Sequence, residues 1–559
     1  MTKSKMNGAK AITQSLINHD VKYVFGIPGA KVDQLFDDLQ YSDDPKAPRL
    51  IIVRHEQNAA FMASGIGRLT GKPGIVAVTS GPGVTNLTTG LVTATAENDP
   101  IVAIGGQVKR DDLARLTHQS IANTALMAPT TKFTAEIQDA NNLSEAFSNA
   151  YQISMQAKKG ATFLSVPQNV LSDSVTRPVM KAPKPVHQGV PDPTDLKQLA
   201  DAIRSAKLPV ILAGMRASDD ETAAGIRHFL KKIPLPVVET YQSAGIIAHD
   251  LEDSYFGRVG LFRNQPGDLL LKQSDLVIAI GYDPIEYEAR NWNHDRQGQV
   301  INLDSVLPEL TADYQPDLIL QGNIATSLEA VSNAFALGFT LSPETNQYLN
   351  GLRHKLEKRD VPPATENPDL VHPLSIVQEL QQRVDDSMTV TVDVGSHYIW
   401  MACHFRSYEP RHLLFSNGMQ TLGVALPWAI SAALVRPNTQ IVSVSGDGGF
   451  LFSGQELETA VREHLNIVQL IWNDGYYDMV RFQERTKYGR ESGVKFGPVD
   501  FAKYAESFGA TGLRVDRDHS LGAVLDQAFA TEGPVVVDIP VDYADNAVLA
   551  KEMLPDKFN

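Results

Sequence analysis

The sequence has 559 residues, of which 43% are hydrophobic and 21% charged, a composition typical of a globular enzyme with about three or four domains. The net charge of −15 and the isoelectric point near 5.4 argue against a nucleic acid or an anionic membrane as the main partner. Cys403 is the one cysteine, so an intrachain disulfide is excluded. We expect a soluble, cytoplasmic protein, because no signal-peptide core follows Met1 and no run of about 18 apolar residues occurs.

Two proline-rich stretches divide the chain into three blocks. Proline removes backbone donors and disfavours helix in the residue before it, so such stretches are usually extended connectors. The first contains Pro178, Pro183, Pro185, Pro191 and Pro193, and the second runs from Val361-Pro362-Pro363 to Asn367-Pro368. The predicted domains are residues 1–180, 190–345 and 370–550.

Each block alternates short apolar runs with helical patterns, which predicts an α/β fold of three doubly wound parallel-sheet domains. The expected strands of the first block are residues 23–25, 50–53, 75–78, 101–104 and 162–166. Those of the central block are residues 209–213, 276–280 and 300–303. Those of the third block are residues 388–392, 441–444, 467–472 and 535–539.

Glu56 is the candidate functional residue of the first block, where it follows an expected strand and opens an expected helix. A helix dipole alone explains a carboxylate at that position. Glycine-rich strand-to-helix turns at residues 25–30 and 79–86 favour a binding site instead, because backbone can approach a ligand closely there. The glycine-rich run at 65–72 lacks the spacing of a phosphate loop, so we expect a helix that ends at Gly71.

Asp447 and Asp474 stand 27 residues apart in the third block, and each directly follows an expected strand. Asp447 lies in a Ser-Gly-Asp-Gly-Gly run and Asp474 in an Asn-Asp pair. The pattern from Ser453 to Glu456 predicts a capping box that opens the intervening helix. Ligands of α/β sheets bind at the carboxyl ends of the strands. Two carboxylates with backbone oxygens suit a hard cation such as Mg2+, and hence a diphosphate.

The Gly-Asp-Gly run, the spacer and the Asn-Asp pair resemble the thiamine diphosphate signature, whereas Gly-Asp-Gly alone is common in turns. Together with the first-block motifs, they make the chain similar to the acetolactate synthases over nearly its whole length. The resemblance implies pyrimidine-binding, central Rossmann-like and diphosphate-binding domains, with thiamine diphosphate and Mg2+ as cofactors. It implies that pyruvate is decarboxylated and its two-carbon unit joined to a second pyruvate, which gives 2-acetolactate and CO2.

The resemblance also assigns roles to individual residues. Glu56 matches the cofactor-activating glutamate, and Gln119 and Gln483 match groups near the reacting carbons. Lys31 and His118 could attract carboxylates, although a surface lysine and a core histidine explain them equally well. The residues that match cofactor-binding positions are Pro28, Glu56, Pro82, Asn86, Gly395, Ser396, His397, Gln420, Leu422, Asp447, Gly448, Gly449, Tyr476, Tyr477 and Met479.

The implied metal ligands are Asp447, Asp474 and the backbone carbonyl of Tyr476. Many relatives have glycine at the position of Tyr476, and a carbonyl ligand tolerates the change if the backbone adopts the same angle. Asn473 remains an alternative ligand.

Several features indicate the catabolic branch of the family, for which neither FAD nor a regulatory subunit is expected. Residues 481–488 resemble a segment of that branch, although a solvated helix explains the charged residues as well. Gln483 aligns with a tryptophan that favours 2-ketobutyrate in biosynthetic relatives, so we expect pyruvate as donor and acceptor. The bulky and acidic residues at 281–287 suit a flavin poorly.

In this family the residue matching Glu56 faces the diphosphate-binding domain of another subunit, which implies a homodimer or homotetramer. The nearest alternative is a pyruvate decarboxylase or oxidase that also uses thiamine diphosphate. A nicotinamide dehydrogenase is disfavoured, because no Gly-x-Gly-x-x-Gly turn follows a strand. A scaffold with decayed sites is disfavoured, because Glu56, Asp447 and Asp474 occur together.

Overall fold

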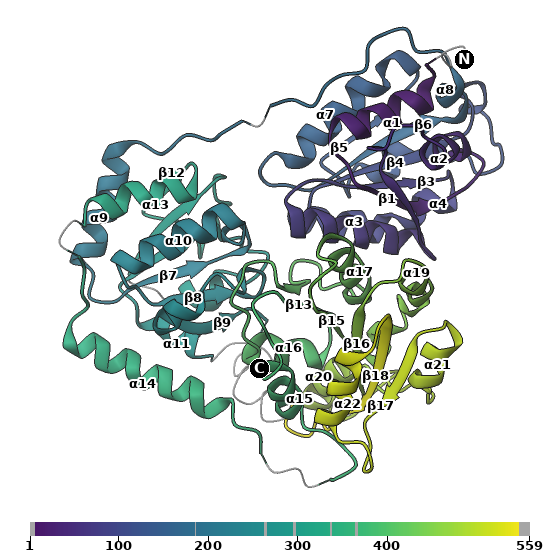
Figure 1. Cartoon of the computed structure of the whole chain (residues 1–559). Helices are drawn as coiled ribbons and strands as arrows, with labels where there is room; N and C mark the ends of the chain where they lie inside the picture. The colour runs from purple at the N-terminus through teal and green to yellow at the C-terminus, as the bar shows by residue number, and fades with distance from the viewer. Residues whose placement is uncertain are drawn as a thin grey trace. The chain divides into compact units, whose positions relative to one another are not determined.

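The structure is a computed structural model that describes residues 6–184, 186–261, 265–294, 298–335, 338–363 and 367–546. Pro185 and the extreme ends of the first and third predicted domains lie outside these residues. Within them, three sheets of six parallel strands each alternate with helices, which confirms the predicted α/β class (Figure 1). Each sheet falls inside one predicted block, while the domain boundaries themselves stay a prediction.

The first sheet has the strand order β2-β1-β3-β4-β6-β5. Its strands are β1 (Tyr23–Ile27), β2 (Arg49–Ile52), β3 (Gly74–Val78), β4 (Ile101–Gln107), β5 (Phe133–Glu136) and β6 (Ala161–Pro167). The accompanying helices are α1 (Gly8–Asn18), α2 (Asp33–Gln40), α3 (Glu56–Thr70), α4 (Pro82–Asn86), α5 (Thr88–Ala96), α6 (Asn123–Met127), α7 (Leu143–Met155) and α8 (Gln168–Ser172).

Both faces of this sheet are covered, as the doubly wound prediction requires. On β3, Ile75 and Ala77 pack in one core cluster with residues of α1, α2 and α7. Val76 and Val78 are also fully buried, and strand alternation places them on the opposite face, where α3 contacts β3. Helix α3 begins at Glu56 and ends at Gly71, whose φ of 70° makes it a left-handed cap, as predicted.

The central sheet has the order β12-β11-β10-β7-β8-β9. Its strands are β7 (Pro209–Ala213), β8 (Val237–Thr240), β9 (Tyr255–Val259), β10 (Leu276–Ile280), β11 (Gln299–Asp304) and β12 (Leu318–Gln321). The accompanying helices are α9 (Pro193–Ser205), α10 (Asp220–Lys232), α11 (Pro266–Gln273), α12 (Arg290–Asn293), α13 (Ile324–Asn333) and α14 (Pro343–Arg359).

The third sheet has the order β14-β13-β15-β16-β18-β17, so β15 and β16 are neighbours. Its strands are β13 (Thr389–Val392), β14 (Leu413–Phe415), β15 (Ile441–Gly446), β16 (Ile467–Asn473), β17 (Thr511–Arg514) and β18 (Pro534–Pro540). The accompanying helices are α15 (Pro373–Gln381), α16 (Ser396–His404), α17 (Ala425–Val435), α18 (Asp447–Phe450), α19 (Leu457–Arg462), α20 (Asp478–Tyr488), α21 (Phe501–Ser507) and α22 (Leu521–Ala530).

By its internal contacts the chain divides into two compact units. The first unit comprises Met1–Val186, Leu426–Asn438 and Ser453–Asn466, and the second comprises His187–Ala425, Thr439–Phe452 and Ile467–Asn559. Helix α19 and nearly all of α17 therefore fold with the first unit, although their sequence lies in the third block.

Buried hydrogen bonds hold α17 in the first unit. The indole nitrogen of Trp428 donates to the hydroxyl of Ser64 at 2.8 Å. The hydroxyl of Ser431 donates to the carbonyl of Met62 at 2.7 Å. Ser64 and Met62 both lie on α3, so the helix that begins with Glu56 packs against a segment from the third block.

The predicted capping box between Ser453 and Glu456 is wrong. Ser453 makes no side-chain cap, and the segment begins with the 3-10 turn η6 (Gly454–Glu456), which leads into α19. The Glu456 carboxylate instead accepts hydrogen bonds from the backbone amides of Arg54 and His55, at the start of α3. A local pattern was thus overridden by a long-range partner.

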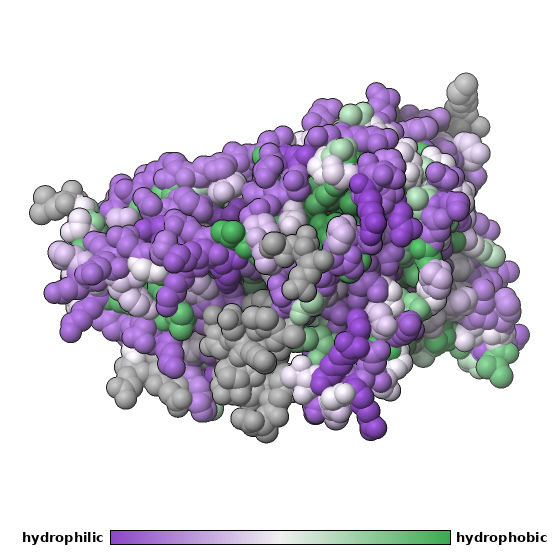
Figure 2. Space-filling view, turned by 90° about the horizontal axis from the view of Figure 1, so that it is seen from below, coloured by the Kyte–Doolittle hydropathy of each residue, from purple (hydrophilic) through white to green (hydrophobic). Residues whose placement is uncertain are grey.

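The face of the molecule in Figure 2 is mostly hydrophilic, with apolar residues scattered among polar ones. Among the described helices, none is long and apolar enough to cross a membrane.

Candidate functional site

The two predicted acidic residues come together because their strands are neighbours. Strands β15 and β16 pair in parallel, with Gly446 opposite Trp472. Asp447 directly follows β15, and Asp474 directly follows β16. Both carboxylates therefore lie at the carboxyl edge of the third sheet, as the spacing predicted.

Backbone amides hold the acidic pair in place. The two oxygens of Asp447 accept hydrogen bonds from the amides of Gly448 at 2.8 Å and Gly475 at 2.7 Å. One oxygen of Asp474 accepts a longer bond of 3.3 Å from the amide of Tyr476. The other, Oδ2, is buried with no hydrogen-bond partner among the described residues, and the nearest guanidinium nitrogen, of Arg481, lies 3.8 Å away.

The electrostatics of this pair favour a bound cation. Burial raises the pKa of Asp447 to about 6. Burial, together with the charges of Asp478 and Asp447, raises the pKa of Asp474 to about 8. A divalent cation between the two carboxylates would offset both effects and would use the orphaned oxygen of Asp474. The residues present therefore fit Mg2+.

The remaining predicted ligands of the cation are the backbone carbonyl of Tyr476 and, as an alternative, Asn473. Within the described residues, no group of three or more His, Cys, Asp and Glu side chains forms a metal-binding cluster. Tyr476 and Lys495 pair as an isolated antiparallel β-bridge. The bridge is made by two hydrogen bonds, from the amide of Tyr477 to the carbonyl of Val494 and from the amide of Phe496 to the carbonyl of Gly475. Neither bond uses the Tyr476 carbonyl, the predicted third ligand. The side-chain amide of Asn473, the alternative ligand, donates to Asp538 at 2.9 Å.

A cavity of about 190 Å³ lies beside the acidic pair. The structure brings together here every cofactor-binding and metal-binding residue that the sequence predicts in the third block. These lining residues are Gly395, Ser396, His397, Gln420, Leu422, Asp447, Gly448, Gly449, Asp474, Tyr476, Tyr477 and Met479. They come from four separate strand-to-helix connections, so the cavity is a product of the fold rather than of one motif.

The wall of this cavity is suited to a phosphate group. A Cβ atom on Gly448 would lie 2.7 Å from the rings of Tyr477 and Phe496, so a larger residue there would require both rings to move. Burial lowers the pKa of His397 to about 3, which keeps the imidazole neutral. Its Nε2 atom is buried with no hydrogen-bond partner among the described residues. Such an orphaned polar atom fits a ligand that supplies the missing partner.

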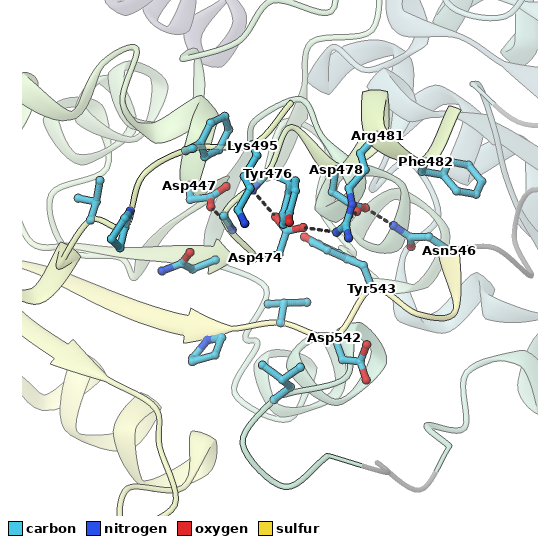
Figure 3. A pocket seen from close by; sticks show the side chains of 18 of the residues that line it. Asp447, Asp474, Tyr476, Asp478, Arg481, Phe482, Lys495, Asp542, Tyr543 and Asn546 are labelled. Carbon is cyan, nitrogen blue, oxygen red and sulfur yellow. Dashed lines mark hydrogen bonds and ion pairs between the residues drawn. The ribbon is translucent and has the colours of Figure 1, made fainter. Parts of the chain in front are cut away.

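A larger cavity of about 1170 Å³ adjoins the acidic pair (Figure 3). Asp447 and Asp474 line it together with Asp478 and Asn546, which the sequence analysis did not identify. Asp478 Oδ2 accepts hydrogen bonds of 2.6 Å from both Ser396 and the side-chain amide of Asn546. Asp478 is the first residue of α20, and in the sequence it looks like an ordinary first-turn carboxylate favoured by the helix dipole.

In the first unit, Glu56 lies beside residues of the 79–86 turn. The amide of Asn86 donates to Glu56 Oε2 at 2.9 Å. A Cβ atom on Gly83 would lie 3.6 Å from Glu56 Oε1. Pro82 opens α4, the short helix that carries Asn86. Three predicted residues thus gather at one place on the first sheet.

Gln119 joins this group through Gly81. Gly81 has a φ of 63°, and a Cβ atom there would lie 3.0 Å from the Cβ of Gln119. Gln119 itself adopts a positive φ of 61°, a conformation that costs free energy outside glycine and is concentrated at functional sites. Pro28 follows β1, and its neighbour Gly29 packs closely against Thr79.

The third predicted catalytic residue, Gln483, lies in the second unit. It is half-buried within α20 and lines neither the 190 Å³ nor the 1170 Å³ cavity. Its predicted role near the reacting carbons stays a prediction.

The carboxyl edge of the central sheet is filled by the chain's own charged side chains. Arg216 forms ion pairs with Asp283 at 2.6 Å and Asp304 at 2.6 Å, and all three side chains are at least nine-tenths buried. Glu286 accepts hydrogen bonds from the amide of Met215 at 2.7 Å and the hydroxyl of Thr240 at 2.8 Å. The acidic residues within 281–287 are thus engaged in ion pairs and hydrogen bonds with other residues of the central domain.

Three family models match the chain at the places these sites occupy. The model described as "Thiamine pyrophosphate enzyme, N-terminal TPP binding domain" matches residues 6–127. The central-domain model matches residues 196–331, and the "C-terminal TPP binding domain" model matches residues 393–539. The chain belongs to the thiamine pyrophosphate enzymes.

Three individual proteins are similar to this chain over nearly its whole length. An acetolactate synthase of Bacillus subtilis (strain 168) is 50% identical, over 99% of this chain and 96% of its own length. A catabolic acetolactate synthase of Raoultella terrigena is 44% identical, over 98% and 97% of the two chains. A probable acetolactate synthase large subunit of Methanococcus aeolicus is 29% identical, over 96% and 92%. The resemblance to acetolactate synthases that the motifs indicate is confirmed.

Proposed function

We propose that this protein is an acetolactate synthase of the catabolic type, which converts two molecules of pyruvate into 2-acetolactate and CO2. The observation that carries the proposal is the identity of 50% and 44% to two acetolactate synthases over nearly the whole chain. The cavity lined by the predicted cofactor-binding residues supports the same reaction class.

Thiamine diphosphate, when bound, supplies a nucleophilic carbon that adds to the ketone of pyruvate and accepts the electrons released with CO2. The turn from Gly395 to His397 would hold its diphosphate. Asp447, Asp474 and the carbonyl of Tyr476 would hold Mg2+, whose charge offsets the two buried carboxylates. Gln420 and Leu422 line the same cavity and would support the ring system.

Glu56 is the residue we assign to proton transfer. Its carboxyl group, oriented by Asn86 at 2.9 Å, would hold a proton against the pyrimidine ring as a general acid–base group. Pro82 and Pro28 shape the turns beside it, and Gln119 would lie near the reacting carbons. Each of these roles is a proposal that mutation can test.

The central sheet supports activity without FAD. At the strand ends of this sheet, Arg216 forms ion pairs with Asp283 and Asp304. A nucleotide bound to an α/β sheet would lie at the same ends. Opening that edge to a flavin would leave buried charges unpaired, which is costly. We assign the enzyme to the branch that uses neither FAD nor a regulatory subunit.

The assembly we assign is a homodimer or homotetramer in which Glu56 of one subunit serves the diphosphate-binding half of another. No nucleic acid or membrane partner is assigned, since the chain carries a net charge of −15. A cytoplasmic location agrees with the single cysteine.

Product analysis tests this function. Purified protein is incubated with pyruvate, thiamine diphosphate and Mg2+, without flavin, and the products are identified by NMR before and after acid treatment. We expect acetolactate, which acid converts to acetoin. Acetaldehyde as the main product would assign the chain to the decarboxylases, and turnover that begins only when FAD is added would assign it to a flavin-dependent branch.

A further inference from the structure

Glu456 is a fully buried carboxylate that the proposed chemistry does not use. It has an exposed fraction of 0% and ends η6, nine residues after Asp447 in the sequence. Although its sequence lies in the third block, it folds with the first unit. A buried carboxylate costs free energy unless hydrogen bonds compensate it.

Those hydrogen bonds come mainly from the start of α3. Glu456 Oε1 accepts from the backbone amides of Arg54 at 3.0 Å and His55 at 3.1 Å. The same oxygen accepts from the buried side-chain amide of Asn58 at 2.9 Å. Oε2 accepts from the hydroxyl of Thr459 at 2.7 Å. The carboxylate therefore joins α19 to both sides of the first turn of α3.

The position also suits a negative charge. Burial raises the pKa of Glu456, while its hydrogen bonds with Thr459, Asn58, Arg54 and His55 oppose that effect. The N-terminal end of a helix carries a partial positive charge that favours a carboxylate. Breaking this arrangement would leave buried donors without a partner.

Glu56 lies between the residues that Glu456 holds. It is the first residue of α3 and directly follows His55, and Asn58 is two residues further on. The chain around Glu56 is therefore held on both sides by one carboxylate, through backbone amides before it and through the side chain of Asn58 after it. Its side chain is fixed separately, by Asn86.

We infer that Glu456 is a positioning residue for Glu56: it fixes the turn from which α3 starts, so that the Glu56 carboxyl keeps its place for proton transfer. The inference rests on the proposed role of Glu56 and concerns a residue that never touches substrate. A displacement of about 1 Å at a reacting group can lower a rate about 100-fold. Loss of the Glu456 hydrogen bonds is therefore expected to lower mainly kcat.

Two substitutions separate hydrogen bonding from folding. Glu456→Ala removes every bond and is expected to lower kcat about 100-fold. Glu456→Gln keeps an oxygen for Arg54, His55 and Asn58, and its NH2 group can donate to the Thr459 hydroxyl. We expect Glu456→Gln to restore kcat to within about threefold of wild type, with the KM for pyruvate little changed in both variants.

Amide hydrogen exchange followed by mass spectrometry supplies a readout that is independent of turnover. In Glu456→Ala, peptides covering residues 53–58 are expected to exchange faster, while those of the third sheet stay protected. Binding of thiamine diphosphate with Mg2+, measured by calorimetry, is expected to stay within about threefold, because the residues assigned to the diphosphate and Mg2+ belong to the second unit.

Glu239→Gln is the matched control. Glu239 is also 0% exposed, and it pairs with the buried guanidinium of Arg258 at 3.0 Å in the central sheet. Its loss is expected to lower the unfolding temperature without the kcat effect. A kcat of Glu456→Ala within threefold of wild type, unchanged exchange at 53–58, or a Glu456→Gln variant as slow as Glu456→Ala would each overturn the inference. If wild type itself makes no acetolactate, the proposed function fails. The exchange experiment still tests whether Glu456 holds the start of α3 in place.

Discussion

The carboxyl group of Glu56 is held from one side by the amide of Asn86, at 2.9 Å. Glu56→Gln keeps the shape and can still accept this bond, but it removes the transferable proton. Because general acid–base groups contribute about 100-fold to 10,000-fold to a rate, turnover of pyruvate is expected to fall at least about 100-fold. Steady-state kinetics and cofactor calorimetry check this together. Turnover within threefold of wild type would refute the assigned role.

Asp447 is expected to act on binding rather than on proton transfer. Asp447→Ala removes one of two buried carboxylates at the strand ends, so it should weaken Mg2+-dependent cofactor binding at least about tenfold. The measurement is the rise in unfolding temperature on addition of thiamine diphosphate at several Mg2+ concentrations.

Asp542→Ala is the control for that experiment, because Asp542 lines the same larger cavity without belonging to the acidic pair. We expect the control to keep the full cofactor-induced stabilisation. An Asp447→Ala protein that the cofactor stabilises as much as it does wild type would contradict the metal assignment.

The sequence could predict those site residues that directly follow a strand and belong to a recognised motif. Asp447 and Asp474 follow adjacent strands, so pairing order alone places them together. Asp478 and Asn546 escaped prediction because neither belongs to a recognised spacing, and their common hydrogen-bonding geometry appears only in three dimensions. Gln483 lines neither cavity, so its predicted role near the reacting carbons rests on the resemblance alone.

Among the secondary-structure elements, the strands that the sequence analysis missed are mostly at sheet edges. Strands β5, β9, β12, β14 and β17 all end a sheet. Two of these edge strands lack a buried apolar run: in β5 and β17 no residue is fully buried. Inner strands such as β10 are buried along their whole length and so give the continuous apolar runs that predict them.

Glu286 links the ends of β7 and β8 in the central sheet, and it makes stability depend on pH. Burial raises its pKa from 4.5 to about 8. Between these values the folded state keeps a proton that the unfolded state has lost, so the stability of the folded state falls as pH rises through this window. Glu286→Gln has no such proton.

We therefore expect the unfolding temperature of wild type to fall more steeply than that of Glu286→Gln between pH 5 and pH 8, as recorded by calorimetry. The exposed Glu344, in the first turn of α14, supplies the control variant Glu344→Gln, which should follow wild type. Parallel curves for wild type and Glu286→Gln would show that Glu286 does not titrate in this way.

At the scale of the whole molecule, sequence order and structural units do not coincide. The segments 426–438 and 453–466 come from the third block but fold with the first unit. Their membership depends on contacts such as Trp428 with Ser64 and Glu456 with Asn58, which span more than 360 residues of sequence.

The proposed assembly can be tested by subunit complementation. Glu56 belongs to the first unit and Asp447 to the second, and we assign them to one active site formed by two subunits. Co-expression of Glu56→Gln with Asp447→Ala should then yield mixed dimers with one intact site each, which is about a quarter of all sites after random pairing. Activity no higher than that of the parent variants would contradict shared sites.

The measurement that tests the central claim most directly is the ratio of CO2 released to pyruvate consumed by the purified enzyme, with thiamine diphosphate and Mg2+ present and FAD omitted. A carboligase that joins two pyruvates releases one CO2 for each pair, and that is the ratio we predict. One CO2 for every pyruvate would show that the two-carbon unit leaves without finding an acceptor, and it would contradict the assignment as an acetolactate synthase.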